Sequence, residues 1–287
     1  MMKIFYFVPL VLLSFQVNGQ FILPIIDDSI APKHEFIFIG LADYSSSSIL
    51  NQLSDMLLYG GEISDEIKTA SFDKHGPINH FGLDLHVGKT INVDLYEPEL
   101  NVFDPLSITK DNYIWHRGYP IEFLQKRHRV EYKGKTERKV LVQADLWDGD
   151  PDIDAMARLT YKPIVKYSDI TEPYCSNAIA PFNSQNTFLA REVIPFYSVL
   201  PFTGRMDDIW GGYILQHYFP NSVIYAPASV YQDRNVQDLV TNLEKEIIGY
   251  RNTLQLVENL VNFEEIIPKE ALEFYNKYKK SFIWKKY

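Results

Sequence analysis

The sequence predicts an α/β fold, and three observations lead to this prediction. Short apolar runs of strand length alternate with segments of helical spacing. The 287 residues are 46% hydrophobic and 14% aromatic, which is enough to bury one sizeable core. After Asn235, apolar residues recur about every three to four positions, which is typical of helices. We therefore expect a sheet covered by helices and a helical C-terminus.

The N-terminus has the pattern of a secretory signal sequence. Lys3 is the only early charge, and an apolar run over residues 4–15 follows it. We expect residues 1–19 to be a signal peptide that is cleaved before Gln20, which directs the chain to the ER or Golgi lumen or out of the cell. The alternatives are an uncleaved anchor or a buried first strand, although Pro9 and the short run argue against a spanning helix.

The net charge excludes one kind of partner, and the cysteine count excludes an internal disulfide. The formal net charge is -9, from 37 acidic and 28 basic residues, so the chain has no basic surface suited to a phosphate backbone. We therefore exclude nucleic acid as a partner. Cys175 is the only cysteine, so no internal disulfide forms and stability must come from the core.

The elements before the middle of the chain follow from short periodic patterns. Residues 34–40 (HEFIFIG) predict a buried strand, and residues 45–59 predict a helix that begins in a run of serines. Alternation over residues 81–96, interrupted at Gly88, predicts a hairpin. Residues 139–146 (KVLVQADL) predict another strand.

The later elements are mainly helical. Residues 207–218 predict a helix and residues 223–227 (VIYAP) a strand. We divide the mature chain into a domain over residues 20–250 and a helical extension over residues 251–287, which offers a surface for a protein partner. The apolar stripe of the first long C-terminal helix consists of Leu239, Leu243, Ile247, Tyr250 and Leu254.

Four polar clusters interrupt this apolar pattern. In the first, WHRGYP, Gly118 and Pro120 hold Arg117 in a turn, where arginine suits a diphosphate or a carboxylate. A surface turn with Trp115 as a core residue is the alternative. The second cluster places five aspartates within residues 145–154, next to a predicted helix start. Such a cluster caps a helix, binds a hard cation or binds sugar hydroxyls.

The third and fourth clusters lie further along the chain. Residues 181–187 (PFNSQNT) carry amides and hydroxyls that could bind sugar hydroxyls or cap a helix beginning near Thr187. Residues 204–212 (GRMDDIWGG) place two acids beside an arginine and a tryptophan at a helix start, which is more than a cap requires. The side chains that we expect to bind substrate in these clusters are Trp115, Asn183, Gln185, Asn186, Arg205 and Trp210.

Five motifs in order resemble a known family. They are IWHRGYP, DGDPDIDAMARLT, APFNSQNTF, GRMDDIWGGYIL and VYQDRN, and the resemblance that they carry covers roughly residues 76–250. The chain resembles the family that joins reversibly glycosylated polypeptides (UDP-arabinopyranose mutases) with STELLO-type glycosyltransferases. The resemblance implies a GT-A-like core that binds a UDP-sugar together with Mn²⁺ or Mg²⁺.

The resemblance also implies site residues. The arginine of the matching motif becomes glycosylated in the mutases, which points to Arg117. The matching acids imply that Asp207 and Asp208 lie nearest the sugar and that Asp152 and Asp154 lie on the acceptor side. We expect Arg117, Asp154 and Asp208 to converge on one cleft.

This sequence departs most from the family's pattern in the part that corresponds to the family's metal site. Asp27 and Asp28 match it only loosely, and few residues precede them, so we expect a shortened nucleotide-binding half. The leading hypothesis is a lumenal glycosyltransferase-like protein with weak or lost turnover of UDP-sugars. The alternatives are a secreted glycan-binding pseudoenzyme and a structural partner of an active enzyme.

Overall fold

The computed structural model describes residues 84–233 and 237–281, together with the backbone of four short strands before them. These strands are β1 (Phe15–Val17), β2 (Gln20–Ile22), β3 (Phe36–Gly40) and β4 (Leu57–Gly60). The rest of the predicted signal sequence, and Asp27 and Asp28, lie outside the described residues. β1 and β2 form a separate antiparallel pair.

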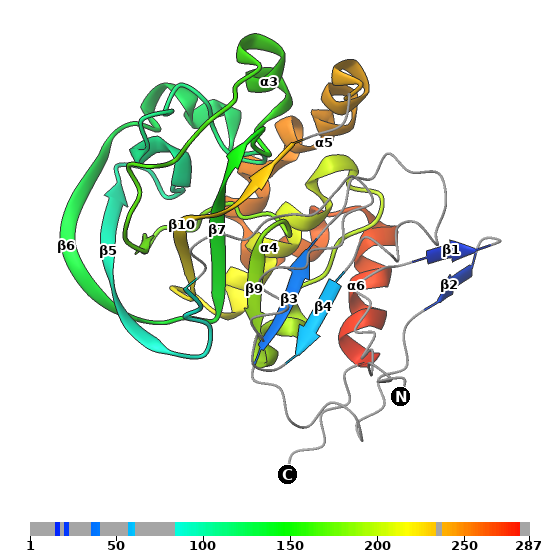
Figure 1. The fold of residues 1–287 in the computed structure, drawn as a ribbon. Helices are drawn as coiled ribbons and strands as arrows, with labels where there is room; N and C mark the ends of the chain where they lie inside the picture. Colours follow the sequence, from blue (N-terminus) through cyan, green and yellow to red (C-terminus); the bar gives the residue numbers. More distant parts are fainter. Residues whose placement is uncertain are drawn as a thin grey trace, which may run out of the picture.

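The fold is α/β, as the sequence predicts, and it is built on one mixed sheet of eight strands (Figure 1). The strand order is β4-β3-β9-β7-β10-β8-β5-β6. β7 and β10 run parallel at its centre, and β9 pairs with β7 in the antiparallel direction. The remaining strands are β5 (Thr90–Pro98), β6 (Val130–Lys139), β7 (Val142–Gly149), β8 (Tyr174–Cys175), β9 (Thr187–Ala190) and β10 (Val223–Gln232).

Four helices accompany the described sheet. They are α3 (Ala155–Tyr161), α4 (Asp207–Tyr218), α5 (Leu239–Glu258) and α6 (Lys269–Ser281). Short 3-10 segments lie between them and the strands: η1 (Pro105–Ile108), η2 (Ile121–Lys126), η3 (Arg191–Phe196), η4 (Gly204–Met206) and η5 (Leu260–Glu265). Among the residues that the structure describes, no helix has both the length and the apolar character needed to cross a membrane.

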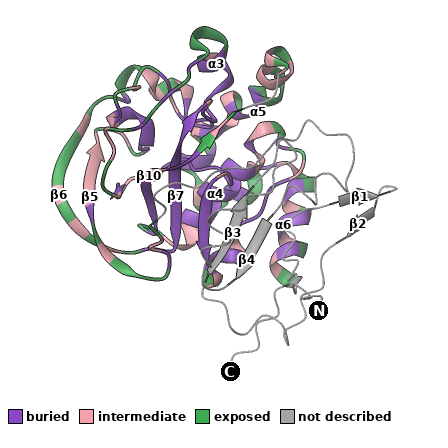
Figure 2. Ribbon diagram, in the orientation of Figure 1, coloured by how far each residue is buried: buried purple, intermediate pink, exposed green. Residues whose placement is uncertain are grey.

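The core lies in two apolar clusters around β7, β10 and α4 (Figure 2). Every residue of β7 is buried, which is expected for a central strand that is covered on both faces. The first cluster belongs mainly to the sheet, and the second lies among α4, α5, η5 and α6. α6 joins the two, because Phe274 and Tyr278 belong to the first and Ala271 and Tyr275 to the second.

The C-terminal helices therefore pack within this chain. The boundary that we predict at residue 250 falls inside α5. The buried side of α5 carries Glu246, Gly249 and Thr253, so the predicted stripe is displaced around the helix, and Ile247 is exposed.

Three predicted elements differ from the structure. β5 pairs with β6, which comes much later in the chain, so the predicted hairpin around Gly88 does not form among residues 84–98. The helix predicted over residues 45–59 is wrong at its end, because β4 begins at Leu57. The helix predicted near Thr187 is also wrong, because β9 begins there and fills the space between β3 and β7.

Candidate functional site

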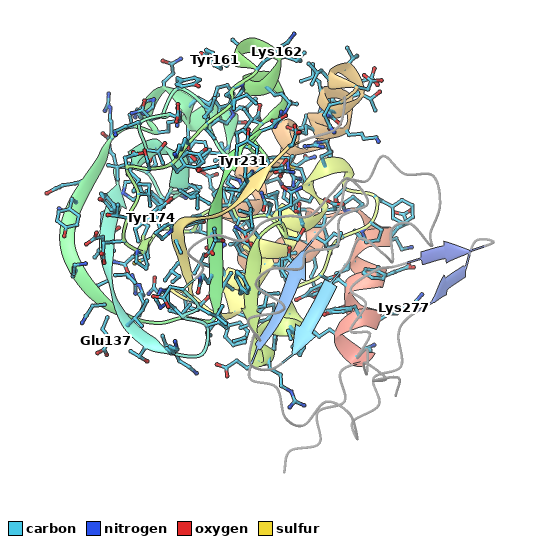
Figure 3. All side chains as sticks on the ribbon, viewed as in Figure 1. Glu137, Tyr161, Lys162, Tyr174, Tyr231 and Lys277 are labelled. Atoms are coloured by element: carbon cyan, nitrogen blue, oxygen red, sulfur yellow. The ribbon has the colours of Figure 1, made fainter. Side chains whose placement is uncertain are left out.

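The predicted site segments meet at one edge of the sheet. β7 and β10 are parallel, so both end at the edge where α3 follows β7 (Figure 1). The loop before β9 returns to the same edge, because β9 is antiparallel to β7 and the Asp145 amide donates to the Asn186 carbonyl at 3.1 Å. Tyr161, which ends α3, and Tyr231, near the end of β10, lie on this side of the molecule (Figure 3). Ligands of α/β proteins bind outside the carboxyl ends of parallel strands.

Arg117 lies at the centre of this edge and is buried. Its Nε and Nη2 donate to Asp152 Oδ2 at 2.9 and 2.8 Å, and Nη2 also donates to Asp208 Oδ2 at 3.1 Å. Nη1 donates to the Arg205 carbonyl. Burial by itself lowers the pKa of Arg117, but Asp152 and Asp208 outweigh it and raise the pKa, so the guanidinium stays charged.

The turn after Arg117 depends on glycine. Gly118 has φ +76°, and a Cβ there would lie 2.4 Å from Ile209 Cγ2 on α4. The absence of a side chain thus allows the turn to rest against α4. The preceding His116 is buried, and its Nδ1 donates to the Arg117 carbonyl at 2.8 Å. Burial lowers the pKa of His116, so the ring is neutral.

Asp208 lies in the first turn of α4, where the helix dipole favours a carboxylate. Its Oδ2 accepts from both the amide and the hydroxyl of Ser184 at 2.9 Å. Burial alone would raise the pKa of Asp208, but the Arg117 guanidinium more than offsets burial and lowers it. The structure therefore holds Asp208 and Arg117 as a buried ion pair.

Arg205 extends the network from η4 to α5. Its Nη2 donates to Asp152 Oδ1 at 3.2 Å, and its Nε donates to Glu246 Oε1 at 2.8 Å. Its side chain is 21% exposed, whereas Asp152 and Glu246 are buried. Arg205 is thus a member of the network that reaches solvent.

Asp154 and Glu246 form a carboxyl pair at the start of α3. Asp154 Oδ1 accepts from the Met156 amide at 2.9 Å and so caps α3. Glu246 accepts from the Ala155 amide at 2.9 Å. The Tyr250 hydroxyl lies 3.1 Å from both carboxyl groups. Burial, together with the neighbouring Glu246, raises the pKa of Asp154 to about 7.

Asn186 belongs to a different buried group. Its Nδ2 donates to the Leu146 carbonyl at 3.1 Å and to Ser229 Oγ at 3.0 Å. The Ser229 hydroxyl donates to Asp145 Oδ2 at 2.6 Å, which links this group to β7. Burial raises the pKa of Asp145 to about 7.

The other predicted residues differ in their access to the edge. Asn183 is buried and donates to Asp152 at 3.1 Å, whereas Gln185 and Asp207 are half-buried beside the network. Trp115 is half-buried, and its carbonyl accepts from the Asp154 amide at 3.3 Å. Trp210 is a fully buried core residue whose Nε1 donates to Thr253, so it does not reach a ligand.

The structure thus brings Arg117, Asp152, Asp154, Asp208 and Arg205 together, but in a buried network. Glu246, Tyr250 and Ser184 complete it. Sequence reasoning missed the first two, whereas Ser184 lies within the predicted polar cluster at residues 181–187. Nothing in the sequence marks Glu246 as a site residue, because a single acidic residue in a polar helical segment is ordinarily exposed to solvent.

The described carboxylates do not by themselves fit a metal centre. Within residues 84–233 and 237–281, no group of three carboxylate, imidazole or thiol side chains is arranged to hold a cation. The oxygens of Asp152 and Asp208 accept from arginine and backbone donors instead. The metal ligands that the resemblance implies, Asp27 and Asp28, lie outside the described residues.

Comparison with known proteins gives no family assignment. No protein-family profile matches the chain, and no curated protein sequence matches it.

Proposed function

We propose that this chain is a glycosyltransferase-like protein with a GT-A-type core that binds a sugar nucleotide or a glycan in the secretory pathway. The proposed site is the edge where β7 and β10 end. One observation supports it above the others: Arg117, Asp152 and Asp208, which come from separate motifs of the resemblance, meet at this edge.

The partly accessible groups at this edge suit hydroxyl recognition. Arg205, Gln185 and Asp207 surround the buried pairs and present donors and acceptors. The buried pairs behind them fix Arg205 through Asp152 and Glu246. In this proposal the network positions the outer residues, and a bound glycan exchanges hydroxyl hydrogen bonds with them.

A second candidate is a glycan-binding protein without transfer activity. One observation favours it over the enzyme: both arginines of the network are already paired with carboxylates, Arg117 with Asp152 and Asp208, and Arg205 with Asp152 and Glu246. A diphosphate would have to compete with these buried pairs for a cation.

Calorimetric titration separates the two candidates. The full chain is titrated with UDP, with UDP-sugars in the presence and absence of Mn²⁺, and with neutral oligosaccharides, alongside an assay of sugar release. Manganese-dependent UDP binding with turnover supports the transferase, and oligosaccharide binding without UDP binding supports the glycan-binding protein.

Two variants locate the binding. Asp207→Asn and Gln185→Ala should weaken it about tenfold each, because the first replaces a charged acceptor with an amide donor and the second removes the side-chain amide at the accessible edge. Glu137→Gln, on the exposed strand β6 (Figure 3), is the matched control and should bind as the unchanged chain does. If no ligand in the panel binds, or if the two edge variants bind normally, the proposal is wrong.

A further inference from the structure

A pocket of about 470 Å³ lies at the opposite end of the sheet from the proposed site. It is bounded by the beginning of β10 at Val223, the end of α4 at His217 and the end of α5 at Val257. β7 and β10 both run away from this end toward α3 (Figure 1). Its volume falls within the roughly 300–1,000 Å³ that small-molecule sites occupy.

Two walls of the pocket are held in place by hydrogen bonds. In the first wall, the Gln216 side chain forms two hydrogen bonds with the backbone of Ala180. Its Oε1 accepts from the Ala180 amide at 3.1 Å, and its Nε2 donates to the Ala180 carbonyl at 2.8 Å. In the second, the Ser222 carbonyl accepts from the amides of Leu141 and Val142 at 3.1 and 3.0 Å. A pocket that is already formed binds its ligand without a large ordering cost.

The lining carries no formal charge. None of its 15 residues is Lys, Arg, Asp or Glu, although 23% of the chain is charged. A phosphate or a carboxylate in this pocket would therefore meet no lining cation, and an ammonium would meet no lining anion. A neutral ligand is the one that this pocket can desolvate at the lowest cost.

Three polar side chains of the lining are available to a ligand. Asn101, His217 and Asn221 form no side-chain hydrogen bond with the described part of the chain. Each can both donate and accept when the imidazole is neutral. Apolar surface from Val257 and Leu260 lies in the same lining.

We propose that this pocket binds a neutral, polyhydroxylated ligand of the size of a monosaccharide. The hydroxyls of such a ligand both donate and accept, which matches the amides of Asn101 and Asn221 and the imidazole of His217. The C–H face of its ring matches the aliphatic side. This site is separate from the edge at Arg117 and stands even if that edge binds nothing.

Saturation-transfer NMR on the full chain tests the pocket. The probes are methyl glycosides of glucose, galactose and mannose, and glucose 1-phosphate serves as the charged counterpart. We expect transfer to at least one methyl glycoside and none to the phosphorylated sugar. Absence of transfer to every methyl glycoside would overturn the proposal.

Substitutions then place the binding in the pocket. Asn221→Gly removes the amide and retains the left-handed backbone at φ +58°. His217→Phe removes the ring nitrogens and keeps an aromatic ring beside Tyr218. Each should weaken binding about threefold to tenfold.

Matched controls sharpen the result. His128→Phe and Asn112→Ala change the same residue types at exposed positions outside the lining and should leave binding unchanged. Unfolding curves confirm that the pocket variants fold, and UDP titration should be unaffected in them. Equal binding by pocket variants and controls would contradict the assignment, as would binding of glucose 1-phosphate that the pocket substitutions remove.

Discussion

The guanidinium of Arg117 donates to the carboxylate of Asp208, which lies 91 residues further along the chain, and both side chains are buried. The pair joins the turn at Gly118 to the first turn of α4. A buried charge that loses its partner is costly, so the pair makes the arrangement of these two segments specific. The same pair supports the outer groups of the proposed site.

Removing one partner should therefore destabilise the protein. We expect Asp208→Ala to lower the free energy of unfolding by about 3 kcal/mol or more, because Arg117 and Ser184 lose an acceptor in a buried place. Urea unfolding measures the change. Glu99→Ala, which breaks an exposed pair with Arg129, is the control and should change little. A loss in Asp208→Ala no larger than in the control would contradict this prediction.

Replacing Gly118 should destabilise the protein through both its backbone conformation and its close contact with α4. Gly118→Ala combines φ +76° with a Cβ 2.4 Å from Ile209, whereas Gly88→Ala has φ +83° and no heavy atom within 4 Å. We expect the first to cost about 1–3 kcal/mol more than the second in thermal or urea unfolding. Equal losses would mean that the contact with α4 does not constrain the turn.

Protonation of Asp154 should make stability depend on pH. Its pKa rises from 3.8 to about 7 in the folded protein, so between these values the folded state binds more protons than the unfolded state. This contribution is full below pH 3.8 and is lost as pH rises through about 7. The loss amounts to at most about 1.4 kcal/mol per pH unit.

Asp154→Asn should remove that contribution. Unfolding free energies of the two proteins, measured across this pH range, should differ by an amount that changes with pH in the stated direction. A constant difference would show that Asp154 does not titrate there. Asp145→Asn is a useful comparison, because the pKa of Asp145 is also raised to about 7 and should give the same sign.

Glu246 should prove essential to the packing of α5 on α3. Glu246→Ala leaves Arg205 Nε and the Ala155 amide without their acceptor, and we expect a loss of about 2–3 kcal/mol in urea unfolding. Glu244→Ala changes an exposed residue on the same helix and should have little effect. Alanine has the higher helix propensity, so propensity cannot explain a loss, and similar losses in both variants would contradict the role of Glu246 as an acceptor.

Sequence patterns predicted elements best where the pattern was local. α4 begins and ends where the sequence predicts, because Asp207 and Asp208 mark its start and Asn221 and Ser222 follow its end. β9 was missed, because four residues are too few to distinguish a strand from a helix start. β5 was recognised as extended, but its partner β6 lies beyond any local signal.

The site was predictable in part for a similar reason. Charged residues such as Arg117 and Asp208 stand out in their motifs, so the sequence suggests that they have a functional role. It does not reveal that they pair in a buried network, because burial depends on segments far away in the chain. Glu246 could not be found at all, since its surroundings in the sequence are those of a solvent-exposed helical face.

Hydrogen-exchange mass spectrometry with the ligand identified by titration tests the central claim most directly. We expect added sugar nucleotide or glycan to slow exchange in residues 150–154, 183–187 and 204–208, which meet at the edge where β7 and β10 end. When the ligand is a sugar nucleotide, residues 216–223 should exchange as before, because the separate pocket is proposed to bind only neutral ligands. Protection confined to other parts of the chain, with these three segments unchanged, would contradict the assignment of the site.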